Sequence, residues 1–334
     1  MSMNRAQFLL SGLEPDNLLA FLALLGLLRC LEAEGDVGNT TRPRVSWVVG
    51  RGPIRPLLSV RPGLTQQDVI QKAADGLTRL AAEHDFNGRK DIDYTHGEAR
   101  TLLRQTALSS KARKRARADL LAALMTDAAL KERNSKGHPT VDPTPLCLLF
   151  GQGHQHFLER LASVPVGSSP DSLTSSLEEA LFAPWGRQDS TPSFRWDPAE
   201  GARYALLAGD PTDNAYKVRV QHGANRLAAV GLAVITVSPT SAGGRVRSSV
   251  IGGRRDRHGF AFAWPINVAP ATLSTLRALL AHPKLWQPQG LVHLDVACVY
   301  VARRISVGKF MNFESGRILA GGGPPIGVAV RQHH

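Results

Sequence analysis

The stretch LLAFLALLGLL, residues 18–28, places 11 apolar residues in a row ahead of Arg29. A helix that spans a membrane needs about 20 such residues, so this run is too short. It does not resemble a signal peptide either, because EPDN precedes it and EAEG follows it. We therefore predict a buried core helix, with Asp16 or Asn17 as its N-cap and Gly35 at its end.

The composition around this helix is that of a folded protein, with 43% hydrophobic and 20% charged residues among 334. A chain of this length forms one large domain or two moderate ones. We predict an α+β fold in which a helical N-terminal and middle region packs against a mixed, mainly antiparallel sheet in the C-terminal half. The predicted units are a lobe of helices and short strands (1–185), a sheet-containing lobe (186–320) and a flexible tail (321–334).

In the first lobe, RVSWVVG (44–50) and PLLSVRP (56–62) are typical of short paired strands. The Ser- and Pro-rich segment 163–176 predicts a surface loop. Apolar residues recur with a helical period elsewhere in this lobe, which predicts helices at 65–83, 97–108, 111–133 and 152–163.

The second lobe alternates short apolar runs with glycine-rich breaks. The runs 228–238 and 293–307 predict parts of the sheet. The second run is apolar on both alternating faces, as a strand in the middle of a sheet would be. A helix is predicted between them at 271–283.

The three cysteines, Cys30, Cys147 and Cys298, lie far apart among apolar neighbours, and none forms a C-x-x-C pair. This spacing predicts neither a zinc ribbon nor a disulfide framework. We expect reduced, buried thiols in a cytoplasmic protein with no membrane partner.

The chain is strongly basic, with 40 Lys and Arg against 28 Asp and Glu and a formal net charge of +12. Such an excess attracts polyanions, so nucleic acid is the first candidate partner. A basic subunit embedded in a larger complex, or a general arginine bias, remains the alternative.

Three segments concentrate the basic residues and are candidate nucleic-acid contacts. In KARKRARADLL, whose alternative role is a solvated helix face, the candidates are Lys111, Arg113, Lys114, Arg115 and Arg117. In the glycine-flanked GGRVRSSVIGGRRDRHGF they are Arg245, Arg247, Arg254, Arg255 and Arg257. In VARRISVGKFMNF, where the phenylalanines stack a base or belong to the core, they are Arg303, Arg304 and Lys309.

The segment EHDFNGRKDIDYTHGEAR, residues 83–100, supports an enzymatic alternative. Its carboxylates and imidazoles are groups that bind metals, so a metal-dependent nuclease would use His84, Asp85, Asp91 and Asp93, with His96 and Glu98 nearby. No periodicity places these side chains on one face, and a polar loop between helices is the favoured interpretation. The chain contains neither G-x-S-x-G nor a Walker-type phosphate loop.

Several blocks of the chain resemble proteins encoded in type I-G (formerly I-U) CRISPR loci, in the helicase-extension family and the small relatives of the large subunit. They are LSGLEPDNLLAFLALLGLLRCLEA, FGQGHQHFLERL, FAPWGRQDSTPSFRWDPAEGARYALLAGDPT, QHGANRLAAVGL and ARRISVGKFMNF. The similarity spans most of the chain, but no block is a catalytic signature.

The resemblance implies a non-catalytic subunit of a Cascade-like, RNA-guided DNA-targeting complex, with no cofactor or metal. Its implied partners are double-stranded DNA at the flanking motif, the displaced single strand, guide RNA, the other effector subunits and the helicase-nuclease. In QHGANRL, the residues Gln221, Asn225 and Arg226 are then candidates for an exposed base-reading turn. The alternative is a helix cap in which Asn225 binds backbone amides. The chain is shorter than full-length large subunits.

The segment FAPWGRQDSTPSFRWDPAEGARYAL, residues 182–206, contains two tryptophans among charged residues. We expect Trp185 and Trp196 to be structural anchors where the chain passes from the first lobe to the second. Nearby aspartates, Asp189, Asp197 and Asp210, would pair with Arg187, Arg195 and Arg203. Of these, Arg187 is retained as a candidate contact to DNA.

Overall fold

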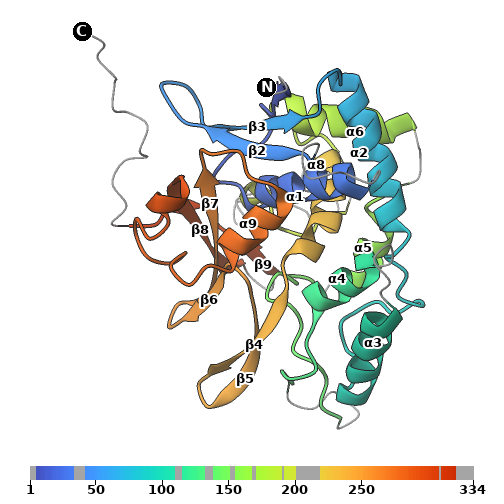
Figure 1. The fold of residues 1–334 in the computed structure, drawn as a ribbon. Coiled ribbons are helices and arrows are strands. Elements are labelled where there is room, and N and C mark those ends of the chain that lie inside the picture. The colour runs from blue at the N-terminus through green and yellow to red at the C-terminus, as the bar shows by residue number, and fades with distance from the viewer. Residues whose placement is uncertain are drawn as a thin grey trace, which may run out of the picture.

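The computed structural model describes residues 5–33, 42–109, 115–131, 138–150, 155–167, 171–189, 192–200, 219–307 and 310–320. The predicted α+β class is confirmed, with helices mainly in the N-terminal and middle parts and a strand-rich C-terminal half. Figure 1 shows most of the helices on one side of the molecule and the long strands on the other, with α9 (Leu273–Leu280) beside the strands. Several predicted features lie outside the described residues: Gly35, Lys111, Arg113, Lys114, Arg203, Asp210, Lys309 and the tail at 321–334.

Helix α1 (Leu18–Ala33) lies at the centre of the core. All of its residues from Leu18 to Leu31 are buried, so it needs no polar face. Asn17 caps it, since its side-chain oxygen accepts a hydrogen bond from the backbone N–H of Leu19 at 2.9 Å. The predicted buried helix and its N-cap are therefore confirmed.

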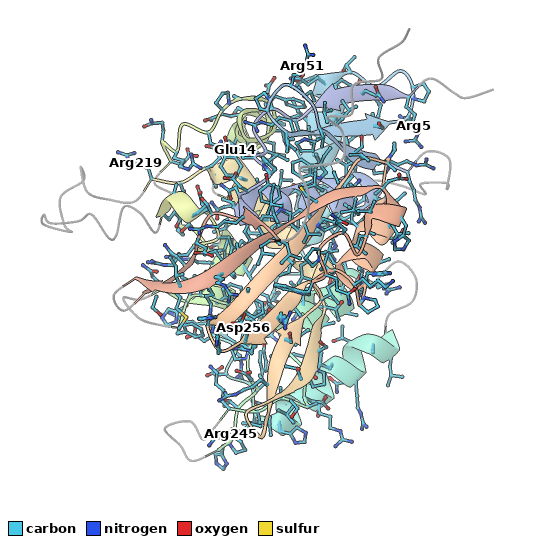
Figure 2. All side chains as sticks on the ribbon, turned by 90° about the vertical axis from the view of Figure 1, so that its left-hand side faces the viewer. Arg5, Glu14, Arg51, Arg219, Arg245 and Asp256 are labelled. Carbon is cyan, nitrogen blue, oxygen red and sulfur yellow. The ribbon has the colours of Figure 1, made fainter. Side chains whose placement is uncertain are left out.

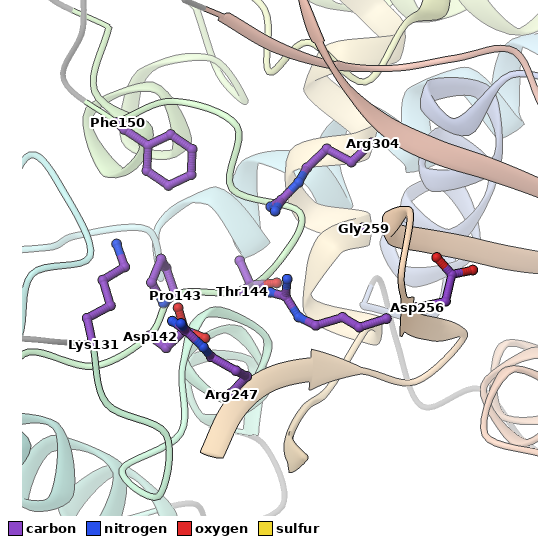
Figure 3. Close-up of a pocket in the computed structure, with 10 residues that line it drawn as sticks. Lys131, Asp142, Pro143, Thr144, Phe150, Arg247, Asp256, Gly259 and Arg304 are labelled. Carbon is purple, nitrogen blue, oxygen red and sulfur yellow. The ribbon is translucent and has the colours of Figure 1, made fainter. Parts of the chain in front are cut away.

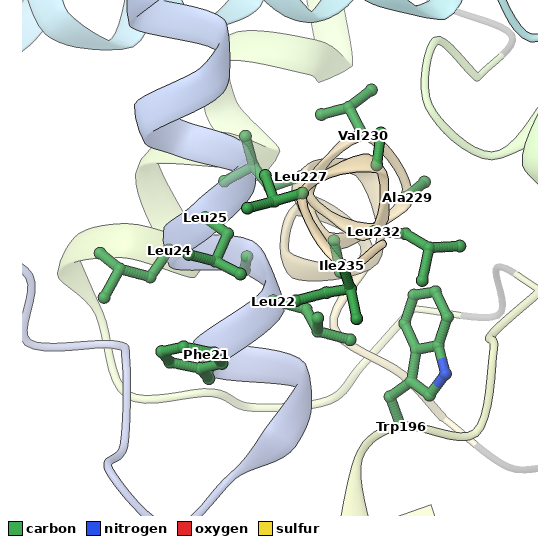
Figure 4. Packing of buried hydrophobic residues seen from close by; sticks show 14 of the residues in the cluster. Phe21, Leu22, Leu24, Leu25, Trp196, Leu227, Ala229, Val230, Leu232 and Ile235 are labelled. Carbon is green, nitrogen blue, oxygen red and sulfur yellow. The ribbon is translucent and has the colours of Figure 1, made fainter. Parts of the chain in front are cut away.

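The main partner of α1 is helix α8 (His222–Gly231), and the two backbones cross at very short range (Figure 4). A Cβ on Gly26 of α1 would lie 1.9 Å from the carbonyl oxygen of Leu227. A Cβ on Gly231 of α8 would lie 2.1 Å from the carbonyl oxygen of Leu22. This approach requires glycine on both helices.

The prediction that 228–238 belongs to the sheet is wrong for most of the run. Helix α8 continues to Gly231, the 3-10 helix η3 (Leu232–Val234) follows, and strand structure begins only at Val237. The cause is that a short run buried on every side has the same apolar pattern in a helix as in a strand.

A small antiparallel sheet with the strand order β1-β3-β2 lies at the N-terminal end of the core. Its strands are β1 (Ala6–Leu9), β2 (Arg44–Val48) and β3 (Arg55–Val60). The predicted pair at 44–50 and 56–62 is therefore confirmed.

The C-terminal half contains a larger antiparallel sheet with the order β10-β8-β7-β6, in which β9 also pairs with β8. Its strands are β6 (Gly253–Asp256), β7 (Gly259–Asn267), β8 (Val296–Val307), β9 (Phe310–Phe313) and β10 (Arg317–Ile318). The prediction of a central strand at 293–307 is confirmed by β8. A separate hairpin of β4 (Val237–Ala242) and β5 (Arg245–Val250) projects beside this sheet (Figure 1).

The remaining helices are α2 (Gln66–Ala81), α3 (His96–Ser109), α4 (Arg115–Leu124), α5 (Phe157–Ser163), α6 (Asp171–Phe182) and α9 (Leu273–Leu280), with the 3-10 helix η4 (Val292–Leu294) before β8. Among them, α2 packs against both α1 and α8, α6 packs against α8, and α3 lies further out beside α4 (Figure 1). The predicted loop at 163–176 is partly wrong, because α6 begins inside it. None of the helices in the described part of the chain has both the length and the apolar composition needed to cross a bilayer.

The segment between α6 and α8 is anchored as its sequence predicts. Trp196 is fully buried, stacks on Phe194 at 4.5 Å between ring centroids, and donates its indole N–H to the carbonyl of Leu146 at 2.9 Å. Trp185 is half-buried against the core. Buried residues from both predicted lobes belong to one hydrophobic cluster, and the boundary at 185 stays a prediction.

Candidate nucleic-acid interface

The strands beside the β4–β5 hairpin bring together basic residues from two segments that lie about 50 residues apart in the sequence. Figure 2 shows Arg245 at the tip of the hairpin, with Asp256 further toward the sheet. The described members of this group are Arg245 and Arg247 on β5, Arg254 and Arg255 on β6, Arg257 in the following turn, and Arg303 and Arg304 on β8. Arg245, Arg254 and Arg257 are exposed.

Arg255 and Arg304 reach the same aromatic ring from two different strands. The guanidinium carbon of Arg255 lies 5.7 Å from the ring centroid of Phe260, and that of Arg304 lies 5.9 Å from it. Arg304 also donates to the carbonyl of Pro145 at 3.2 Å. The Nε of Arg255 donates to the carbonyl of Ser248 at 3.4 Å. These contacts hold both guanidinium groups in place before any ligand arrives.

The two guanidinium groups also repel each other. Burial lowers the pKa of Arg304, and the charge of Arg255 lowers it further. Burial likewise lowers the pKa of Arg255, while the charge of Asp142 raises it and the charge of Arg247 lowers it by less. An arginine keeps its charge in proteins, so this lowering indicates that burying the two charged guanidinium groups costs free energy, which the charge of Asp142 offsets in part.

These residues open onto a cavity of about 440 Å³, shown in Figure 3. Lys131 and Phe150 line one side of it, while Arg304 reaches in from the opposite side. The ammonium of Lys131 lies 5.4 Å from the ring centroid of Phe150, which is 42% exposed. The described residues that line it are Lys131, Asp142, Pro143, Thr144, Phe150, Arg247, Arg255, Asp256, Gly259 and Arg304.

Both carboxylates of the lining already have partners. Asp256 accepts two hydrogen bonds from Arg303, at 2.8 and 3.0 Å, and these bonds lower its pKa to about 2. Its side chain points away from the cavity in Figure 3. Asp142 is buried and accepts a hydrogen bond from the backbone N–H of Ser248 at 2.8 Å. Among the described lining residues, four cationic side chains therefore face an interior in which one carboxylate, that of Asp142, is not paired with arginine.

Of the described lining residues, the sequence predicts Arg247, Arg255 and Arg304, and it misses the others, among them Lys131, Asp142 and Phe150. Lys131 and Asp142 belong to the segment before α5, where Lys131 N–H donates to the carbonyl of Thr140 at 2.7 Å. No local pattern marks them, because their proximity to β5, β6 and β8 arises only from the tertiary fold. An aromatic residue next to a glycine, as in LLFGQG, is the one sequence signal at Phe150.

The basic residues of α4 do not line this cavity. Arg115 is exposed and pairs with Asp119 at 3.3 Å. Arg117 packs over the ring of Phe86 at 5.2 Å and donates to the carbonyl of Glu83. Arg117 also lines a separate cavity of about 520 Å³ beside α3.

The prediction of an exposed reading turn at Gln221, Asn225 and Arg226 is wrong, because all three are buried. The cause is the packing of α8 against α1. Asn225 accepts a hydrogen bond from the backbone N–H of Phe194 at 3.4 Å, and Arg226 donates to His222 at 2.8 Å. The alternative prediction, a helix cap in which Asn225 binds backbone amides, is right about the amide contact, but Asn225 lies inside α8, whose N-cap is Gln221.

Arg187 is also committed to a structural contact. Its Nε lies 2.6 Å from a carboxylate oxygen of Asp197, which is fully buried, and its guanidinium packs over the ring of Trp185 at 5.5 Å. Asp197 further accepts a hydrogen bond from Asn17, the cap of α1, at 3.1 Å. The expected pairing of arginine with aspartate in this segment is therefore confirmed for Arg187.

The candidate metal ligands of segment 83–100 contact different partners and do not converge on one point. His84 is buried, its Nδ1 lies 2.8 Å from the carbonyl of Leu161, and burial lowers its pKa to about 4. Asp91 contacts His156 at 2.7 Å, and Asp93 pairs with Arg89 at 2.9 Å.

Asp85 in the same segment accepts a hydrogen bond from the backbone N–H of Asn87 at 2.8 Å. His96 and Glu98 lie in the first turn of α3, where Glu98 pairs with Arg89 at 2.9 Å. The described residues contain no group of three or more His, Cys, Asp or Glu side chains placed to hold one metal ion.

Comparisons of the chain with protein-family models, with curated proteins and with solved structures found no match.

Proposed function

We propose that this chain is a non-catalytic nucleic-acid-binding subunit of an RNA-guided DNA-targeting complex, and that the basic surface around β5, β6 and β8 grips the phosphate backbone. The observation that carries the proposal is the convergence of Arg247, Arg255 and Arg304 on one cavity with Lys131. The choice of complex rests on the sequence blocks that resemble CRISPR-associated proteins.

Physical chemistry supports a polyanionic partner at this surface. Holding the charges of Arg255 and Arg304 beside the same phenylalanine ring, with Asp142 as the carboxylate that acts on both, costs free energy, and a bound phosphate would offset that cost. Arginines outside the cavity, Arg245, Arg254 and Arg257, extend the charge along the hairpin and the β6–β7 turn. Contacts between arginine and phosphate bind the nucleic-acid backbone whatever its base sequence, and they release counterions from the nucleic acid.

In this proposal the chain works in the cytoplasm beside the other effector subunits, guide RNA and the helicase-nuclease. It contacts the duplex next to the target or the strand that base pairing with the guide displaces. A purely architectural subunit is the alternative, and it would bind other subunits but no free DNA.

The proposal is tested by fluorescence anisotropy with labelled DNA of about 30 bases, both single-stranded and duplex, at about 50 mM salt. The exposed triple variant Arg245→Gln, Arg254→Gln, Arg257→Gln should bind at least about tenfold more weakly than the unmodified chain. The matched control is Arg51→Gln with Arg61→Gln, two exposed arginines of the β2–β3 region. Figure 2 places Arg51 at the end of the molecule opposite Arg245.

Equal affinities for the triple variant and the control would contradict the proposed surface. Absence of binding to either DNA would favour the architectural alternative. Cleavage of the labelled DNA on addition of Mg²⁺ or Mn²⁺, lost in Asp85→Ala, would instead establish the nuclease alternative.

A further inference from the structure

The cavity has two chemically different sides. Arg304 and Arg255 form a side that presents guanidinium donors, fixed against Phe260. Phe150 forms the other side, and 42% of its surface is exposed although it is a large apolar residue. Figure 3 shows the phenyl ring of Phe150 and the side chain of Arg304 reaching toward the same space from different segments.

The guanidinium groups have donors to spare for a ligand. Arg304 uses its Nη1 to bond the carbonyl of Pro145, and Arg255 uses Nε and Nη2 to bond the carbonyl of Ser248 at 3.4 and 3.5 Å. A guanidinium carries five N–H donors, so each group retains N–H bonds for the oxygens of an anion. Phosphate oxygens match this geometry well.

The aromatic side of the cavity discriminates among phosphate ligands. A free phosphate would gain nothing from Phe150, whereas a nucleotide base would stack on its exposed ring. The bases of an intact duplex are stacked on one another, so they offer no face to a side chain unless one base is turned out. The volume of about 440 Å³ lies in the range of cavities that hold one small organic molecule.

We infer that the cavity binds one unpaired nucleotide of a nucleic-acid strand, with its phosphate on Arg255 and Arg304 and its base against Phe150. The inference rests on the proposed function and narrows it, since it makes this site selective for single strands. The exposed arginines would bind either kind of backbone, and the cavity alone would distinguish an unpaired strand from a duplex.

The experiment compares Phe150→Ala and Phe150→Leu with the unmodified chain, using labelled single-stranded DNA, single-stranded RNA of the same sequence and duplex DNA. The matched control is Leu108→Ala, which shortens another exposed apolar side chain, 87% exposed on α3. Both Phe150 variants should lose about 5- to 100-fold in affinity for single strands, because one stacked base is lost. Their affinity for the duplex and their salt dependence should not change. The DNA and RNA arms identify which strand is preferred.

A second variant tests the phosphate side. Arg304→Gln should weaken binding of the same single strands and reduce the slope of log affinity against log salt by about one unit. Thermal unfolding of each variant checks that the fold is kept.

Equal losses for single strand and duplex in Phe150→Ala, or no loss at all, would overturn the inference. If the exposed triple arginine variant still weakens binding in that case, the proposed function stands without it. If no nucleic acid binds the unmodified chain, both fail together.

Discussion

Helices α1 and α8 cross in close backbone contact at Gly26 and Gly231, and the surrounding side chains are apolar. In the basic cavity, Arg255 and Arg304 meet across a single aromatic ring, and their charges repel each other. The first region gains free energy from close packing and burial. The second gives up free energy unless an anion occupies it.

This contrast predicts that different substitutions change the stability of the fold and its affinity for nucleic acid. At the edge of the core, the fold supplies a carboxylate for an arginine: Arg187 pairs with the fully buried Asp197 at 2.6 Å. In the cavity, the described residues supply too few carboxylates. Changes near α1 and α8 should therefore affect folding, and changes in the cavity should affect binding.

The largest effect is expected from Gly26→Ala, because the new Cβ would lie 1.9 Å from the carbonyl oxygen of Leu227. The helices would have to move apart, which costs about 3 kcal/mol of the free energy of unfolding, the upper end of the range for an overpacked core. Gly50→Ala is the control, since nothing lies within 4 Å of its Cβ position. Urea unfolding of both variants measures the difference, and equal stabilities would contradict the close crossing.

The core was largely predictable and the cavity was not, for a physical reason. The run at 18–28 is apolar on all sides, so its burial follows from its own composition. The run that forms β8 is apolar on both alternating faces, which predicts a central strand. The helix α8 was misassigned because its run is short and apolar on all sides too. Burial of Arg226 in that helix could not be foreseen from one sequence.

Some residues of the cavity are predictable from their neighbours in the sequence, and others come together only in the tertiary fold. The arginines of β5, β6 and β8 were predicted from their clustering in sequence, which is a local property. That they share a cavity with Lys131, Asp142 and Phe150 depends on the path of the chain before α5. Apart from the glycine that follows Phe150, nothing in residues 131–150 distinguishes these three from ordinary loop residues. The pairing of Arg187 with Asp197 was anticipated because both lie in one short segment.

A buried carboxyl offers a test of the core as a function of pH. Burial, with the nearby charge of Asp197, raises the pKa of Glu200 from 4.5 to about 8. The folded state thus holds this proton more tightly than the unfolded state, so the stabilisation is full below pH 4.5 and is lost as the pH rises to about 8.

The variant Glu200→Gln stays neutral at every pH. Its stability relative to the unmodified chain should therefore rise between about pH 5 and pH 9, by an amount on the order of a few kcal/mol. Urea unfolding across that range measures the change. A difference that is the same at both ends of the range would contradict the buried, protonated carboxyl.

The variant Arg187→Gln distinguishes a paired arginine from the unpaired arginines of the cavity. It leaves the buried Asp197 without its ion-pair partner, and we expect a loss of about 2 kcal/mol in the free energy of unfolding. Its affinity for DNA should equal that of the unmodified chain in anisotropy measurements. Weaker DNA binding by the folded variant would place Arg187 in the interface.

The reverse pattern is expected for Arg304→Gln. This variant loses one hydrogen bond to Pro145 but relieves the repulsion from Arg255, so its stability should stay within about 1 kcal/mol. Its affinity for DNA should fall about tenfold at low salt, since one or more phosphate contacts are lost. A large loss of stability with unchanged binding would show that Arg304 is structural.

The smallest effect is expected from Asp142→Asn. The amide oxygen can still accept the hydrogen bond from Ser248 N–H, while the one carboxylate that is not paired with arginine disappears. We expect affinity for DNA to increase about two- to threefold at low salt. Titration of the same labelled strand measures this gain, and a decrease would mean that Asp142 helps to hold the arginines in place.

The most direct test is the salt dependence of DNA affinity for the unmodified chain and for Arg247→Gln, Arg255→Gln, Arg304→Gln. If about six phosphates are contacted, affinity falls about a thousandfold between 50 and 200 mM salt, and the triple variant lowers the slope of log affinity against log salt by up to about three units. A salt-insensitive interaction, or the same slope in both proteins, would contradict a phosphate-binding cavity.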